Sequence, residues 1–172
     1  VSCSIPFGIS GAVAPVFFTQ ELKWSSESYS QIVGGPGMIC GLIAAIMGGW
    51  LVDRFGARRM MAIGFLGGSI AFISFGLFES VWQSTPLVVF YLCVQQFFVS
   101  LSTVGKFALF MSVSWVRVAG TQFTAYMALL NLSRSIGNIA AGPLDDALSY
   151  GQIFVVCGTI LAFVTLLLPL ID

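Results

Sequence analysis

Two basic residues lie inside long apolar stretches of this sequence, Lys106 among Phe, Val and Leu residues and Arg134 among Ala, Leu and Ile residues. If these stretches cross a membrane, a charge near the bilayer centre costs about 2.5 to 3.5 kcal/mol on insertion scales, so each cation must face protein or water. No Asp or Glu lies in the middle of an apolar stretch. The chemistry that the two cations offer is therefore the binding of an anionic group.

Other polar residues share a helical face with each cation. Around Arg134 they recur at intervals of seven, which keeps them in one narrow stripe at about 100° per residue. The members of this stripe are Thr124, Asn131, Asn138 and Asp145. Gln95, Ser102 and Lys106 share one face of the preceding stretch. Two polar stripes on adjacent helices predict one lined pathway, whose candidate substrate-binding residues are Gln95, Lys106, Asn131, Arg134 and Asn138.

Three explanations of these cations remain open. Lys106 and Arg134 bind an anionic group of a substrate, or they meet an acidic residue on a partner part of the protein. In the third explanation, Lys106 extends along its helix to reach the cytoplasmic interface. The first explanation makes the two cations site residues, and the other two make them structural.

The composition requires a membrane environment. Hydrophobic residues make up 58% of the 172 residues, charged residues only 8%, and Phe alone occurs sixteen times. A soluble domain of this size would have too little polar surface to cover its apolar residues. We therefore expect a multi-pass integral membrane protein of an inner or plasma membrane, surrounded by the lipid bilayer.

Six apolar runs, each close to the roughly 20 residues that a transmembrane helix needs, are separated by short polar breaks. They predict one bundle over residues 1–172, with helices near residues 3–22, 30–52, 59–79, 86–115, 120–144 and 150–171. We expect an all-α fold, because backbone groups that face lipid must be hydrogen-bonded within their own helix.

The charges in the polar breaks predict the orientation of the bundle. Strict alternation places Arg54, Arg58, Arg59 and Arg117 at one end and most of the acidic residues at the other. The positive-inside rule makes the arginine-rich end cytoplasmic. Six crossings then leave both termini of this segment on the cytoplasmic side.

Several classes of protein and site are not expected. The formal net charge is zero, so the sequence offers no basic field for nucleic acid. It contains no His and no intramembrane pair of Asp residues, so we expect no enzyme, no catalytic residue, no metal site and no other cofactor. The four cysteines have no paired spacing and are interpreted as free packing thiols.

Residues 48–59 read Gly-Gly-Trp-Leu-Val-Asp-Arg-Phe-Gly-Ala-Arg-Arg, a charged turn between two apolar runs. Its marked positions are Gly49, Asp53, Arg54, Gly56, Arg58 and Arg59. Their spacing resembles the loop signature of the major facilitator superfamily of membrane transporters, which joins the second and third helices of a six-helix half. The resemblance implies a gating loop that holds the cytoplasmic helix ends together in one conformation and releases them in the other. The alternative is a loop that only fixes topology.

A second resemblance concerns residues 117–143. The start Thr121-Gln122-Phe123, the Asn-, Ser- and Arg-bearing helix that follows, and Gly142-Pro143 look like the eleventh helix of the AmpG-like permeases, a branch of that superfamily that includes muropeptide, acetyl-coenzyme A and siderophore transporters. This resemblance implies that the chain corresponds to helices seven to twelve. We therefore expect a fragment of a twelve-helix transporter whose partner is a missing N-terminal six-helix half.

Small residues recur at every fourth position of the second run, Gly37, Gly41, Ala45 and Gly49, and predict a flat face for close helix packing. Three other runs repeat the pattern with Ser4, Gly8 and Ala12, with Gly64 and Gly68, and with Ser133, Gly137 and Ala141. The two sets of three runs have similar lengths, and a Gly-x-x-x-Asp sequence follows the second and fifth runs. Two three-helix units of inverted topology fit this pattern.

Together these features predict a secondary transporter that moves a small anionic solute by alternating access, as a symporter driven by protons. The alternative is a membrane sensor or scaffold that has the same fold and transports nothing.

Overall fold

The computed structural model describes residues 2–168, and every regular element in this range is helical. The α-helices are α1 (Ile5–Gln20), α2 (Ser26–Ile32), α3 (Met38–Phe55), α4 (Ala57–Leu77), α5 (Thr85–Val113), α6 (Ala119–Ala147) and α7 (Tyr150–Leu167). A π-helical segment, η2 (Val33–Gly37), joins α2 to α3, and the short 3-10 segments are η1 (Ser2–Ser4), η3 (Glu79–Gln83) and η4 (Val116–Val118). The all-α prediction is confirmed.

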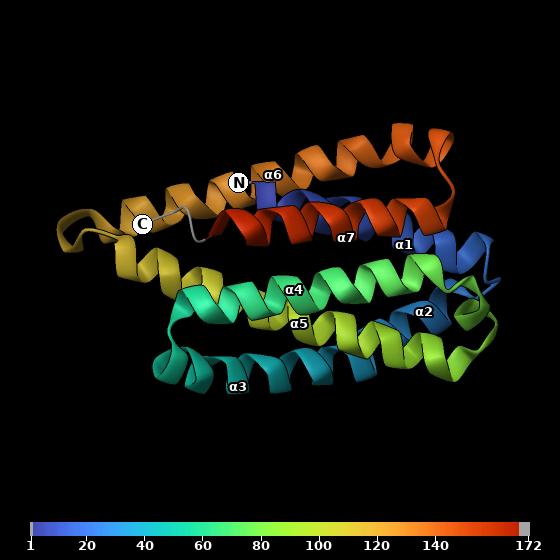
Figure 1. Cartoon of the computed structure of the whole chain (residues 1–172), viewed down its shortest axis with the longest axis horizontal. Helices are drawn as coiled ribbons and strands as arrows, with labels where there is room; N and C mark the ends of the chain where they lie inside the picture. Colours follow the sequence, from blue (N-terminus) through green and yellow to red (C-terminus); the bar gives the residue numbers. More distant parts are fainter. Residues whose placement is uncertain (1, 169–172) are drawn as a thin grey trace.

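These helices form six antiparallel rods, because α2, η2 and α3 make one continuous rod over Ser26–Phe55 (Figure 1). Each rod overlaps one of the six apolar runs of the sequence. By length and composition, four rods could cross a membrane: Ser26–Phe55, Ala57–Leu77, Thr85–Val113 and Tyr150–Leu167. The remaining apolar helix, Ile5–Gln20, is shorter, and α6 is long but carries the polar stripe.

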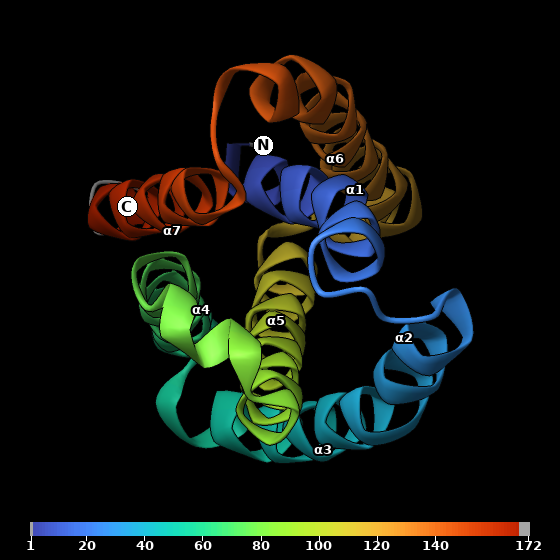
Figure 2. The same cartoon turned by 90° about the vertical axis from the view of Figure 1, so that its right-hand side faces the viewer.

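The rods are arranged as two equivalent groups of three. One group is α1, the α2–α3 rod and α4, and the other is α5, α6 and α7. The second rod of each group packs on the first rod of the other group, α3 on α5 and α6 on α1. Likewise α4 packs on α5 and α7 packs on α1, while α4 and α7 pack against each other (Figure 2). Because the second group starts at the opposite end of the bundle, the contacts match the inverted three-plus-three repeat expected from the sequence.

Glycines allow the rods to approach closely at their crossing points. A Cβ atom built on Gly8 of α1 would lie 3.0 Å from the Cα atom of Gly137 on α6, and the reverse holds as well. On Gly64 of α4 a Cβ atom would lie 2.6 Å from the backbone nitrogen of Ser102 on α5. Close packing through small residues therefore replaces the hydrophobic driving force that is absent between helices in lipid.

The packing face of α3 differs from the one expected. Gly41 and Gly48 are buried against α5, where built Cβ atoms would meet Ser100 and Leu101, and Ala44 is fully buried between them. Gly49 is only half-buried, and a Cβ atom there would have no neighbour within 4 Å. The prediction that Gly49 packs closely was wrong for this bundle. At 3.6 residues per turn, a strict four-residue repeat drifts about 40° at each step, so the contact face moves to Gly48.

Candidate solute-binding cavity

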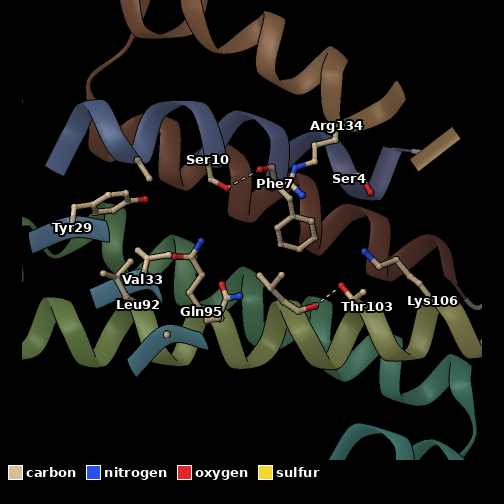
Figure 3. A pocket seen from close by; sticks show the side chains of 15 residues that line it. Ser4, Phe7, Ser10, Tyr29, Val33, Leu92, Gln95, Thr103, Lys106 and Arg134 are labelled. Atoms are coloured by element: carbon tan, nitrogen blue, oxygen red, sulfur yellow. Dashed lines mark hydrogen bonds between the residues drawn. The ribbon is translucent and has the colours of Figure 1, made fainter. Parts of the chain in front are cut away.

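A cavity of about 350 Å³ lies between α1 and α5, with further walls from α2, η2 and α6 (Figure 3). Its volume is at the small end of the range of about 300 to 1,000 Å³ that is usual for ligand pockets. It contains three of the five candidate substrate-binding residues, Gln95, Lys106 and Arg134. The cavity therefore brings together members of both polar stripes, but not all of the candidate residues.

Lys106 is the buried charge of this cavity. Its relative exposure is 6%, and its ammonium nitrogen lies 5.4 Å from the ring centroid of Phe7 on α1 and 5.8 Å from that of Phe65 on α4. The preceding residue, Gly105, lets α5 approach α4 so closely that a Cβ atom would lie 2.8 Å from the Met61 nitrogen. Lys106 is thus enclosed between helices and does not extend to the end of the bundle.

The two rings stabilise only part of the lysine charge. A cation–π contact contributes about 0.5 to 2 kcal/mol, whereas a charged side chain at membrane depth costs about 2.5 to 3.5 kcal/mol. In the part of the chain that the structure describes, no carboxylate forms an ion pair with Lys106. The cavity around it is therefore suited to a ligand that supplies negative charge.

Arg134 reaches the same cavity from α6. Its helix crosses α1 where the Arg134 carbonyl oxygen touches Gly8, and its guanidinium lies next to Gly11, 3.7 Å from a Cβ atom built there. In Figure 3 the Phe7 ring lies beside the ends of both the Arg134 and the Lys106 side chains. Two cations thus face one wall of the cavity from two helices, although Arg134 itself remains exposed.

The opposite half of the cavity carries no charge. Gln95 and Leu92 come from α5, Tyr29 from α2 and Val33 from the π-helical segment. The Tyr29 ring is 5.0 Å from that of Phe18 on α1, so α2 packs against α1 at this end. Tyr29 and Phe7 were not among the candidates, because nothing in their local sequence distinguishes a cavity-lining aromatic residue from a core one.

Asn131 and Asn138 lie outside this cavity. Both are exposed on α6, which turns Ser133, Gly137 and Ala141 toward α1. They share the stripe of Arg134, but they are exposed on α6 and do not line the cavity. That Asn131 and Asn138 line a pathway stays a prediction, because the described residues leave this surface of α6 uncovered.

The charged turn of residues 48–59 joins α3 to α4. Gly56 ends α3 with φ of 88°, a left-handed conformation that favours glycine, and α4 begins at the next residue. Asp53 is exposed, and the Arg54 guanidinium carbon lies 5.6 Å from the Trp50 ring centroid. Arg58 and Arg59 are exposed in the first turn of α4, where the helix dipole disfavours cations.

The charged loops gather at opposite ends of the bundle. The α3–α4 and α5–α6 connections lie at one end in Figure 1. Beside or within them are the four arginines of the polar breaks: Arg54 at the end of α3, Arg58 and Arg59 at the start of α4, and Arg117 in η4. The α1–α2, α4–α5 and α6–α7 connections lie at the other end. The acidic residues of that second end are Glu21, Glu27, Glu79, Asp145 and Asp146. The charge asymmetry expected from alternation is thus present in three dimensions.

Comparison with known proteins agrees with this architecture. A 28% identical segment of 81 residues is found in an uncharacterized MFS-type transporter of Bacillus subtilis (strain 168), YqjV, and covers 47% of this chain and 18% of that protein. No solved structure matches the chain. The family described as Major Facilitator Superfamily matches residues 1–171. Its match extends over nearly all of the helical bundle, and the chain belongs to the major facilitator superfamily of membrane transporters.

Proposed function

We propose that this chain forms one six-helix half of a secondary transporter that moves a small anionic solute by alternating access. The observation that carries the proposal is Lys106, a buried cation beside a cavity with no carboxylate to pair with it among the described residues. Arg134 faces the same cavity and adds a planar guanidinium, which suits a carboxylate or phosphate. The resemblance of residues 117–143 to the AmpG-like permeases supports a solute with an acidic group.

Proton coupling is the proposed energy source. Within residues 2–168 every carboxylate lies at a helix end or in a connection, so none is placed to carry a proton at the cavity. We assign that role to an acidic residue of a second six-helix half, which would also cover Asn131 and Asn138 on the open side of α6. Each half would then contribute one part of the mechanism.

The proposed gate is the loop between α3 and α4. Asp53 and Arg54 are exposed at the end of the bundle that we assign to the cytoplasm. An exposed carboxylate that docks at the N-terminus of a helix in the other half gains about 0.3 to 1 kcal/mol, and more when shielded. Such a contact biases the equilibrium between two conformations by that amount.

The test is a screen of small carboxylates and phosphate esters for uptake by proteoliposomes that contain the complete transporter. Arg134→Ala should lower the affinity for an accepted anion about tenfold or more, and Arg134→Lys should lower it less, because the charge is kept but the two-pronged geometry is lost. Arg117→Ala is the matched control, since Arg117 lies in the α5–α6 connection beside Trp115. Unchanged affinity in Arg134→Ala would refute the contact, and anion binding without uptake would indicate the sensor alternative.

A further inference from the structure

The cavity is strongly asymmetric along its length. Lys106 and Arg134 occupy one half, next to Phe7 (Figure 3). The other half is lined by Gln95, Leu92 and Tyr29, none of which is charged at neutral pH. Along α5 the backbone positions of Gln95 and Lys106 are about 16 Å apart, since a helix rises about 1.5 Å per residue. A ligand that fills the cavity therefore meets two different environments.

We infer that the solute is an elongated organic anion with its negative charge at one end, bound with that charge toward Lys106 and its uncharged, hydrogen-bonding body toward Gln95 and Tyr29. This inference rests on the proposed function and names the substrate class of the same site. Its basis is the juxtaposition, in one cavity, of a buried ammonium group that has no carboxylate partner among residues 2–168 with a neutral polar compartment.

The energetics of burial favour one charged end over two. A carboxylate placed near Lys106 gains a charge-assisted contact, and the pair is stronger where water is excluded. A second carboxylate at the Gln95 end would lose its hydration and find only an amide, a phenol and apolar side chains. A hydroxyl or amide at that end would instead replace its water contacts with hydrogen bonds to Gln95 or Tyr29. The cavity should therefore discriminate against anions with a charge at both ends.

The small volume limits the ligand further. At about 350 Å³ the space accommodates a compact chain and not a bulky polymer. A spherical inorganic anion would reach the cations but leave the neutral half unfilled, so it would gain little from that half. The volume and the charge distribution of the cavity therefore both favour a compact organic acid with one charged end.

Binding to the complete transporter, reconstituted in lipid nanodiscs, tests the inference with a series of matched length. The probes are 6-hydroxyhexanoate, hexanoate, adipate, 1,6-hexanediol and inorganic phosphate. We expect 6-hydroxyhexanoate to bind, the diol to bind undetectably, and adipate and phosphate to bind about tenfold or more weakly than the hydroxy acid. Adipate or phosphate binding as tightly as 6-hydroxyhexanoate would overturn the inference, as would no binding of 6-hydroxyhexanoate at millimolar concentration.

Substitutions at the two ends separate this inference from the function on which it rests. Gln95→Lys places a cation in the neutral half and should reverse the preference, so that adipate binds more tightly than 6-hydroxyhexanoate. Tyr29→Phe keeps the ring on Phe18 but removes a hydroxyl, so it should reduce the advantage of 6-hydroxyhexanoate over hexanoate without affecting folding. An unchanged selectivity in both variants refutes the orientation, while loss of all anion binding in Lys106→Met would still support the anion site. Undiminished binding in Lys106→Met would refute the site itself.

Discussion

The ammonium group of Lys106 lies 5.4 Å from the centre of the Phe7 ring, although the two residues are far apart in the sequence, in α5 and α1. The contact holds a cation in the interior without neutralising it. A buried charge that is not neutralised lowers the stability of the fold. Such a cost is expected where the charge is needed to bind a ligand. A substitution of Lys106 should therefore change ligand binding and stability in different directions.

Lys106→Met should abolish anion binding and leave thermal stability unchanged or higher. Met has a similar length and removes a buried charge whose desolvation opposes folding. Thermal unfolding in detergent and ligand binding are the two measurements. Lys23→Met in the exposed α1–α2 connection is the control and should change neither. A strongly destabilised Lys106→Met protein would show that Lys106 is structural.

Gly137→Ala should destabilise the bundle by about 1 to 3 kcal/mol, the usual cost of overpacking. The added methyl group would collide with the Ile5 carbonyl oxygen and lie 3.0 Å from Gly8 Cα, so α6 could not remain this close to α1. Gly120→Ala on the same helix is the matched control, because a Cβ atom there has no neighbour within 4 Å. Its melting temperature should be unchanged or slightly raised by the better helix propensity of Ala. Equal melting temperatures for both variants would contradict the close crossing.

Asp53→Asn should slow transport and leave solute affinity unchanged, because the residue lies at the end of α3, far from the cavity. The change removes the charge of the proposed gate contact but keeps the size of the side chain. Uptake rate and equilibrium binding measured on the same preparation distinguish the two effects. Asp146→Asn, at the opposite end of the bundle, is the control. Wild-type uptake by Asp53→Asn would remove the loop from the gating mechanism.

The Gly49→Leu substitution gives a different expectation from the one that the sequence suggests. The sequence places Gly49 on the packing face, where Leu would block close contact within this half. In the structure the position is open, so Gly49→Leu should leave the stability of this bundle unchanged. Gly48→Leu should destabilise it, because a built Cβ atom already lies 3.2 Å from the Leu101 side chain. Thermal unfolding of the two neighbouring variants tests the corrected face.

The loop between α3 and α4 should be cytoplasmic, and the α6–α7 connection should lie on the other side of the membrane. In a background without the four native cysteines, Ala57→Cys should resist a membrane-impermeant thiol reagent in intact cells, and Ala147→Cys should react. Ala147 is exposed, so its labelling is not limited by burial. Labelling of both positions in lysed cells is the control. The reverse pattern in intact cells would invert the proposed orientation.

The sequence by itself determined where the helices lie and that the charged residues gather at their ends. Six apolar runs are a local property, and the rods overlap them because a backbone in lipid has no alternative to helical hydrogen bonding. The turn at Gly56 was also visible, since a charged Gly-containing segment interrupts two apolar runs. Lys106 and Arg134 could be selected for the same reason, because charges within apolar runs are costly wherever the helices pack.

Only the tertiary structure decided which faces meet. The rotation of α3 that buries Gly48 and exposes Gly49 depends on the neighbouring helix α5, and a repeat of four cannot specify it over several turns. The same holds for Phe7 and Tyr29, which line the cavity, and for Asn131, which does not. Periodicity relates residues within one helix, whereas a cavity depends on the distances and rotations between helices, which packing across the whole bundle determines.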